Sequence, residues 1–311
     1  QADYEVIPGL TLTAGGRYSK EEKTFTTQPL FYPNAETFEA SFDDFSPKVG
    51  VSYKWSDTLM TYAQYSRGFR AGGFNGRAGS FLAVGPYDSE TVDSYEVGVK
   101  SDLFDRRLRL NAAVFTSDYQ DMQQSVQQLI PGTLINQTLV SNVGAATISG
   151  FEAEATALLT NVFTISASVG YLDASYDEFM ADLGDGLGVI DRTYLPMPYA
   201  PKWSNSVTFN YKDDFDFGRV TAQASVRHMT DMYTSFSTLN ATTDLTMRQS
   251  NTVVDGSLSL ELPDGRWRVS LWGKNLTDEL VINNTFGVGN LLASRVYQPP
   301  REIGVDLSLT F

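Results

Sequence analysis

The stretch that decides the fold is Glu302-Ile-Gly-Val-Asp-Leu-Ser-Leu-Thr-Phe311, in which apolar and non-apolar residues alternate strictly. In an extended strand, residues i and i+2 lie on the same face. The segment therefore has one apolar face and one polar face, and this two-residue period predicts an amphipathic β-strand.

The same period recurs along the chain, as in Phe163 to Tyr171 and Leu108 to Val114. No long amphipathic helix interrupts it. The pattern predicts twelve strands, near residues 10–22, 46–55, 58–68, 92–103, 107–120, 148–159, 162–175, 202–211, 219–232, 252–262, 266–275 and 301–311.

The connections between these strands alternate strictly in length. The short turns are Ser56-Asp57, Asp105-Arg106, Thr160-Asn161, 213–218 and 263–265, and the long links are 23–45, 70–91, 121–147, 176–201, 233–251 and 276–300. This alternation predicts an up-and-down antiparallel sheet with all tight turns at one end and all large loops at the other.

Segregated loops favour an outer-membrane barrel over a soluble all-β protein, in which the alternation would mark only a core face. Such barrels have short periplasmic turns, long extracellular loops and strands with apolar side chains facing the lipid. Tyr and Trp near strand ends suit interfacial girdles. We therefore predict an all-β fold, a transmembrane antiparallel up-and-down β-barrel.

Composition excludes several other classes. The 311 residues carry a formal net charge of −14, no Cys and one His. No window is long and apolar enough for a membrane helix. Disulfide and thiol chemistry are excluded, a His-based metal site is improbable, and nucleic acid is an unsuitable partner for so acidic a chain.

Several motifs resemble those of TonB-dependent outer-membrane receptors. They are Phe45-Ser-Pro-Lys-Val-Gly-Val-Ser-Tyr-Lys-Trp55, Thr61-Tyr-Ala-Gln-Tyr-Ser-Arg-Gly-Phe-Arg-Ala-Gly-Gly-Phe-Asn75, Glu90-Thr-Val-Asp-Ser-Tyr-Glu-Val-Gly-Val-Lys-Ser-Asp-Leu-Phe104, Gly273-Lys-Asn-Leu-Thr-Asp-Glu279 and the segment Pro299 to Phe311. They follow one another in the order expected for the family and cover nearly the whole chain.

The resemblance implies active import of a scarce nutrient across the bacterial outer membrane. The family's barrel has 22 strands and an N-terminal plug, and the TonB–ExbB–ExbD complex supplies energy through a TonB box. Residues 1–311 are therefore expected to form the C-terminal part of such a barrel, with the plug and TonB box absent from this chain. Ferric siderophore, another metal chelate, a vitamin such as cobalamin, or an oligosaccharide would fit as substrate.

The resemblance places substrate contacts in extracellular loops. Guanidinium and aromatic groups suit an anionic chelate or a sugar ring, and Asn suits hydroxyl-rich ligands. The candidates are Arg67, Arg70, Phe74, Asn75, Arg77, Phe81, Tyr87, Asn283, Phe286 and Tyr297. Glycines that shape turns and aromatic residues that anchor the rim are the structural alternative. The carboxylates of 176–200 do not have EF-hand spacing, so a solvated acidic loop is expected there.

Charged residues on the polar strand face are expected to face the lumen or the plug: Glu96, Lys100, Glu152, Glu154, Arg268 and Asp306. A terminal aromatic on an alternating strand resembles the signal read by the barrel-assembly machinery, which makes Phe311 a candidate assembly signal. Lipopolysaccharide and other outer-membrane lipid are expected around the barrel.

Two alternatives remain open at this stage. A self-contained twelve-stranded barrel could act as a passive pore or translocator. An outer-membrane phospholipase would use His228 to activate a serine, although no orienting partner or nucleophile can be assigned. The preferred interpretation is a transporter with no catalytic residues, no metal site and no cofactor.

Overall fold

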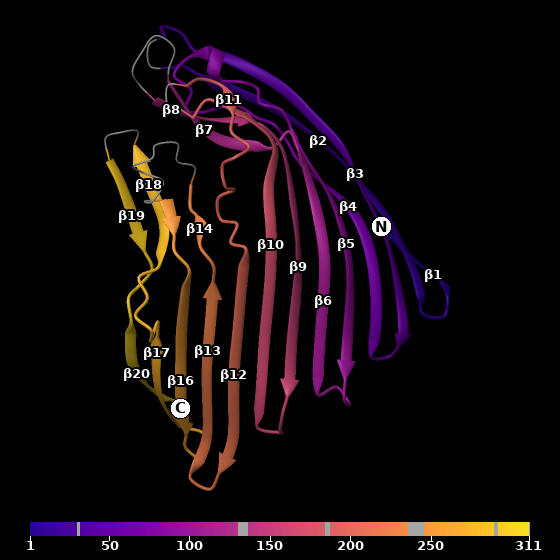
Figure 1. The fold of residues 1–311 in the computed structure, drawn as a ribbon, viewed down its shortest axis with the longest axis vertical. Helices are drawn as coiled ribbons and strands as arrows, with labels where there is room; N and C mark the ends of the chain where they lie inside the picture. Colours follow the sequence, from indigo (N-terminus) through magenta and orange to yellow (C-terminus); the bar gives the residue numbers. More distant parts are fainter. Residues whose placement is uncertain (30–31, 130–135, 184–186, 236–245, 289–291, 311) are drawn as a thin grey trace.

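The computed structural model describes residues 1–29, 32–129, 136–183, 187–235, 246–288 and 292–310. Its main feature is a tall, curved antiparallel sheet of 14 strands (Figure 1). Thirteen of them follow one another in the order β1-β2-β3-β4-β5-β6-β9-β10-β12-β13-β16-β17-β20, and β11 pairs with the upper part of β10. No helix among the described residues is long and apolar enough to cross a membrane.

The sheet strands have the following bounds: β1 Ala2–Ile7, β2 Leu10–Thr27, β3 Glu36–Ser56, β4 Leu59–Arg70, β5 Glu90–Leu103, β6 Leu108–Gln120, β9 Gly144–Leu158, β10 Phe163–Ala181, β11 Ile190–Asp191, β12 Trp203–Phe215, β13 Gly218–Met229, β16 Asn251–Glu261, β17 Trp267–Lys274 and β20 Glu302–Leu309. All twelve strands that the period predicted are present. The prediction missed β1, which forms a tight hairpin with β2.

The long links are more ordered than the sequence indicated. β2 and β3 remain paired out to Thr27 and Glu36, and β10 continues to Ala181. Three further hairpins lie within links expected to be loops: β7 (Gln123–Leu129) with β8 (Asn136–Asn142), β14 (Met232–Tyr233) with β15 (Met247–Arg248), and β18 (Ile282–Val288) with β19 (Leu292–Tyr297). A short 3-10 turn, η1, spans Phe81–Ala83. Local alternation could not reveal pairings whose partners lie in the loops themselves.

Register gives the sheet two chemically different faces. One face carries two rows of aromatic side chains with aliphatic residues between them. Tyr65 and Tyr95 lie in the upper row with ring centroids 5.1 Å apart, and Phe163 and Phe209 lie in the lower row, 6.4 Å apart. Phe163 and Tyr171 are eight residues apart on this face, which is about 27 Å along a strand. That spacing matches the apolar band of a membrane barrel, so this is the outer face.

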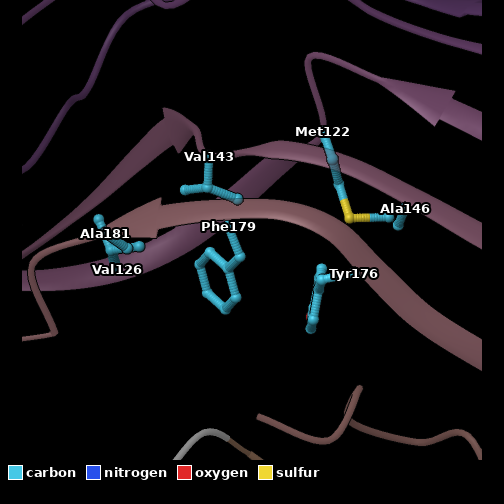
Figure 2. Close-up of a cluster of buried hydrophobic side chains, with 7 residues drawn as sticks. All are labelled: Met122, Val126, Val143, Ala146, Tyr176, Phe179 and Ala181. Atoms are coloured by element: carbon cyan, nitrogen blue, oxygen red, sulfur yellow. The ribbon is translucent and has the colours of Figure 1, made fainter. Parts of the chain in front are cut away.

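The hydrophobic core lies at the upper end of the sheet, where β9 and β10 meet the β7–β8 hairpin. A cluster of buried residues joins the β7–β8 hairpin to the upper part of β10, and Figure 2 shows Phe179 and Tyr176 on β10 close to Val143 and Met122. The cluster comprises Met122, Val126, Val143, Ala146, Tyr176, Phe179 and Ala181. We call this part of the molecule, together with residues 71–89, the cap.

Candidate substrate-binding surface

The inner face of the sheet is polar, and its charged groups are mostly held by neighbours on adjacent strands. The Tyr62 hydroxyl donates to Glu96 Oε1 at 2.6 Å, and Gln64 Nε2 donates to the same oxygen at 3.2 Å. Lys100 Nζ lies 5.6 Å from the centroid of the Tyr62 ring. The structure therefore brings Glu96 and Lys100 together on the inner face, with Tyr62 between them.

Two carboxylates on β9 are different. Glu152 and Glu154 project from the same inner face, and both are exposed. In register, Glu152 lies between Ala113 on β6 and Gly170 on β10. No hydrogen bond or ion pair joins either carboxylate to another described residue.

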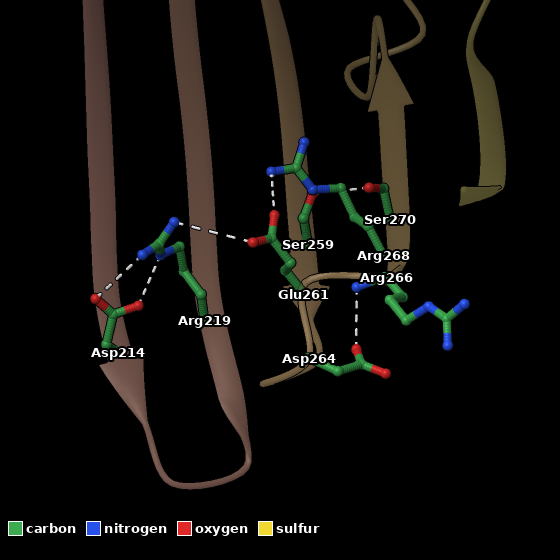
Figure 3. A network of polar contacts seen from close by, with 8 residues as sticks. All are labelled: Asp214, Arg219, Ser259, Glu261, Asp264, Arg266, Arg268 and Ser270. Atoms are coloured by element: carbon green, nitrogen blue, oxygen red, sulfur yellow. Dashed lines mark hydrogen bonds and ion pairs between the residues drawn. The ribbon is translucent and has the colours of Figure 1, made fainter. Parts of the chain in front are cut away.

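A ladder of alternating charges crosses four strands near the short turns (Figure 3). Arg219 Nε lies 2.6 Å from Asp214 Oδ1. The Glu261 carboxylate forms ion pairs with Arg219 Nη1 at 3.9 Å and with Arg268 Nη2 at 2.8 Å. Arg268 thus lies on the inner face of the sheet. Asp306 continues that face on β20, where it pairs in register with Ser270.

A groove of about 530 Å³ lies higher on the inner face, over β13, β16, β17 and β20. Arg227 and Asp255 form an ion pair of 2.6 Å within it. Lys274 lies 5.6 Å from the centroid of the Trp272 ring and pairs in register with Glu302. Opposite charges alternate here as well, so the groove has no strong preference for one sign of ligand.

The cap uses several of the predicted loop residues for its own packing. Phe74 stacks on Phe25 of β2 with ring centroids 5.9 Å apart, and Phe81 lies 6.1 Å from Phe38 of β3 and 4.4 Å from Tyr32. Phe25 and Phe38 pair in register on the inner face of the β2–β3 extension. Residues 71–89 therefore pack on the inner side of that extension, above the lumen.

Asn75 is also committed within the cap. Its side chain is buried, accepts from Val140 N at 2.7 Å and donates to the carbonyl oxygens of Val140 and Ala83 at 3.1 and 3.3 Å. The amide group therefore joins residues 71–89 to β8. Arg77 is exposed, and Tyr87 forms a backbone bridge with Gly73.

Arg67 and Arg70 were expected at the start of a loop. β4 extends to Arg70, however, so both residues lie within this strand. Arg67 pairs in register with Asp93, 3.5 Å from its carboxylate, and lies on the outer face with Tyr65. It therefore points away from the lumen. Arg70 lies on the opposite, inner face and pairs in register with Glu90.

The candidates in 277–299 lie on the β18–β19 hairpin. Asn283 is exposed, Tyr297 pairs in register with Ile282, and Phe286 belongs to β18. The hairpin is tied to the segment before β12, because the Tyr199 hydroxyl donates to Asn284 Oδ1 at 2.9 Å. Phe311 lies outside the described residues.

The acidic segment 176–200 has local roles in its described part. Asp177 accepts from the Thr147 hydroxyl at 2.7 Å, and Asp191 accepts from Thr193 N at 2.9 Å. The backbone and hydroxyl of Thr193 hold the pKa of Asp191 below its usual value. Among the described residues, no group of three His or acidic side chains is placed to hold a metal ion.

His228 lies on the outer face of β13, the same face as Val226. Its Nδ1 is 2.9 Å from Thr252 Oγ1, and its register partners are Asn205 and Thr252. Neither neighbour is a serine.

Two important groups escaped the sequence analysis: the Arg227–Asp255 pair and the Tyr62 hydroxyl. Tyr62 could have been found from the inner-face parity that identified Glu96. The Arg227–Asp255 pair depends on the register between β13 and β16, which no local pattern reveals.

The curved sheet has two aromatic rows on its outer face, a polar inner face and a packed cap at its upper end. These features are those of part of the wall of a membrane-spanning β-barrel. The family model for "TonB dependent receptor-like, beta-barrel" matches residues 1–276. The chain belongs to this family, and the protein resides in the bacterial outer membrane.

Relatives and solved structures agree with this assignment. The chain is 25% identical over 215 residues to the probable TonB-dependent siderophore receptor PiuA of Acinetobacter baumannii, covering 67% of this chain and 28% of that protein. It is 25% identical to the ferric-pyoverdine M114 receptor PbuA of Pseudomonas sp. strain M114, covering 97% and 34%. The ferric yersiniabactin uptake receptor FyuA of Yersinia pestis has the same fold, with a TM-score of 0.80, 18% identity and coverage of 99% and 44%.

The chain thus spans about a third or less of the curated relatives it matches. Members of this family are transporters and receptors.

Proposed function

We propose that the full protein is an active importer that binds a scarce, small-molecule nutrient on its extracellular side. A metal chelate of the siderophore type is the favoured substrate, because the named relatives are siderophore receptors. The observation that carries the proposal is the cap, which packs over the inner face of the sheet. A cover at the extracellular mouth suits selective capture and does not suit free diffusion.

Energy would come from the TonB–ExbB–ExbD complex, acting on a plug and TonB box outside residues 1–311. The exposed candidates Arg70, Arg77, Asn283 and Tyr297, together with the half-buried Tyr87, are proposed to meet the substrate. Arg67 is better placed to meet outer-leaflet lipid, including lipopolysaccharide. Phe74, Asn75 and Phe81 are proposed to shape the cap.

We further propose that the protein catalyses no reaction. In support, the His228 ring meets a threonine on the outer face and no serine lies beside it in register. A phospholipase would require a nucleophile next to this imidazole. Substitution His228→Ala should leave transport unchanged, and the purified protein should release no fatty acid from phospholipid.

The test of import is radiolabelled uptake from a panel of ferric siderophores. The full-length gene is expressed in a host that lacks its own siderophore receptors, and in the same host without TonB. We expect uptake of at least one chelate only where TonB is present. Equal uptake in both hosts, or a conductance from the purified protein at rest, would identify a passive pore instead.

A further inference from the structure

A small pocket of about 300 Å³ lies on the inner face of the sheet, between the sheet strands and the residues Tyr199, Pro201 and Met232. Its wall side is formed by Phe115, Glu152, Gly170 and Met229, and its cover includes Tyr199 and Met232. We propose that this pocket binds an ammonium or guanidinium group carried on an apolar stem, with Glu152 as the counter-ion.

The charge of the pocket supports a cationic ligand. Glu152 is its one carboxylate among the described lining residues, and none of those residues is basic. The register neighbours of Glu152 are Ala113 and Gly170, which offer no polar side chain. The carboxylate therefore has no partner among the described residues, unlike Glu96 and Asp255, which are both hydrogen-bonded. Because Glu152 is exposed to the inside of the pocket, its carboxylate is free to attract a cation that enters from the lumen.

The walls support an apolar stem. Phe115 and Tyr199 line the pocket with aromatic side chains, a residue type that attracts cations. Met229 and Met232 contribute flexible thioether side chains, which adapt to irregular ligands. A Cβ added at Gly170 would lie 3.0 Å from Oγ of Ser204, another lining residue, so glycine keeps this part of the pocket open.

The cover of the pocket is held in place before any ligand binds. The Tyr199 hydroxyl donates to Asn284 Oδ1 at 2.9 Å, and its backbone N donates to the Tyr233 carbonyl at 2.8 Å. Met232 is buried, with 7% of its surface exposed. Pre-positioned walls lower the entropic cost of binding.

This inference rests on the proposed import function, because it assigns the ligand of the same lumen. One source of the ammonium or guanidinium group is a diffusible substrate that carries an amine or guanidine. The same chemistry could be supplied by a Lys or Arg side chain from another part of the full protein, and the experiment distinguishes the two sources.

The probe is 1,5-diaminopentane, with 1-pentanol as its neutral counterpart, added to the purified full-length receptor. Binding is followed by saturation-transfer NMR and titration. We expect the diamine but not the alcohol to bind. Glu152→Gln should weaken binding about tenfold or more, a loss of about 1.4 kcal/mol. Glu154→Gln is the matched control, since it lies on the same strand face outside the pocket, and it should bind like the wild type.

If the diamine does not bind, a second measurement asks whether a protein side chain already fills the pocket. Glu152→Gln, but not Glu154→Gln, would then make one lysine or arginine newly reactive to amine- or guanidine-modifying reagents in the folded receptor. That result supports the cation site and assigns it to the polypeptide. Unchanged binding and unchanged reactivity in Glu152→Gln would overturn the proposal. Neither readout depends on transport, so a failure of import would not produce the same result.

Discussion

The side chain of Asn75 and the backbone of Val140 form a reciprocal pair of hydrogen bonds across 65 residues of sequence. Val140 N donates to Asn75 Oδ1 at 2.7 Å, and Asn75 Nδ2 donates to the Val140 carbonyl at 3.1 Å. The amide thus imitates a strand neighbour for β8. It fixes residues 71–89 against the β7–β8 hairpin and so fixes the position of the cap.

Replacing this amide should loosen the cap without unfolding the barrel. Asn75→Ala leaves buried backbone groups without partners, which costs about 1–3 kcal/mol. We expect faster amide hydrogen exchange in residues 71–89 and 136–142, measured by mass spectrometry. Arg77→Ala is the control, since that exposed side chain has no described partner. Unchanged exchange in Asn75→Ala would show that other contacts hold the cap.

The buried cluster makes a separate prediction. Phe179 has no exposed surface, and truncation of a buried Phe typically costs about 3–5 kcal/mol. Phe179→Ala should therefore sensitise the upper part of β10 to limited proteolysis while the barrel keeps its heat-modifiable migration. Phe217→Ala removes a ring that is 58% exposed beside a short turn, and it should show no such sensitivity. Equal digestion of both variants would argue against a cap core.

The assignment of the two faces can be tested at neighbouring positions. Ala167 lies midway between the aromatic residues Phe163 and Tyr171 on the outer face, and Ser166 lies on the inner face. An arginine at the lipid midplane costs about 2–4 kcal/mol, whereas the lumen tolerates charge. We expect Ala167→Arg to reduce the folded barrel recovered from outer membranes and Ser166→Arg to have little effect. The reverse result would invert the faces.

Phe311 makes a prediction that rests on sequence alone. If the terminal aromatic is an assembly signal, deleting it should lower the amount of heat-modifiable protein in the outer membrane, measured by unheated gel migration. Phe311→Tyr should assemble normally, because the aromatic ring is kept. Normal assembly of the deletion would remove the signal from consideration.

The size of the native polypeptide tests the domain organisation. Scaling the thirteen consecutive strands of the sheet to 22 and adding a plug predicts roughly twice the 34.3 kDa of this chain, or more. The denatured mass of the protein from native outer membranes measures this directly. A mass near 34.3 kDa would remove the plug and TonB coupling from the proposed function.

The sequence by itself determined twelve strands of the sheet, their faces and the end of the sheet at which each connection lies. These features are local, because side-chain alternation has a period of two and a tight turn needs only a few residues. Both His228 and Glu96 can be assigned to a face by counting from their strand neighbours, and the register places His228 on the outer face and Glu96 on the inner face.

Only the tertiary structure decided what the loop residues do. Phe74, Asn75 and Phe81 have the composition of a ligand site, but they pack against Phe25, Phe38 and Val140, which are distant in sequence. Arg67 was predicted to lie in an extracellular loop, but it belongs to β4, pairs with Asp93 of β5 and lies on the outer face. The isolation of Glu152 likewise follows from the register that sets Ala113 and Gly170 beside it. Such contacts depend on pairing between separate strands and loops, and a local pattern of residues carries no record of that pairing.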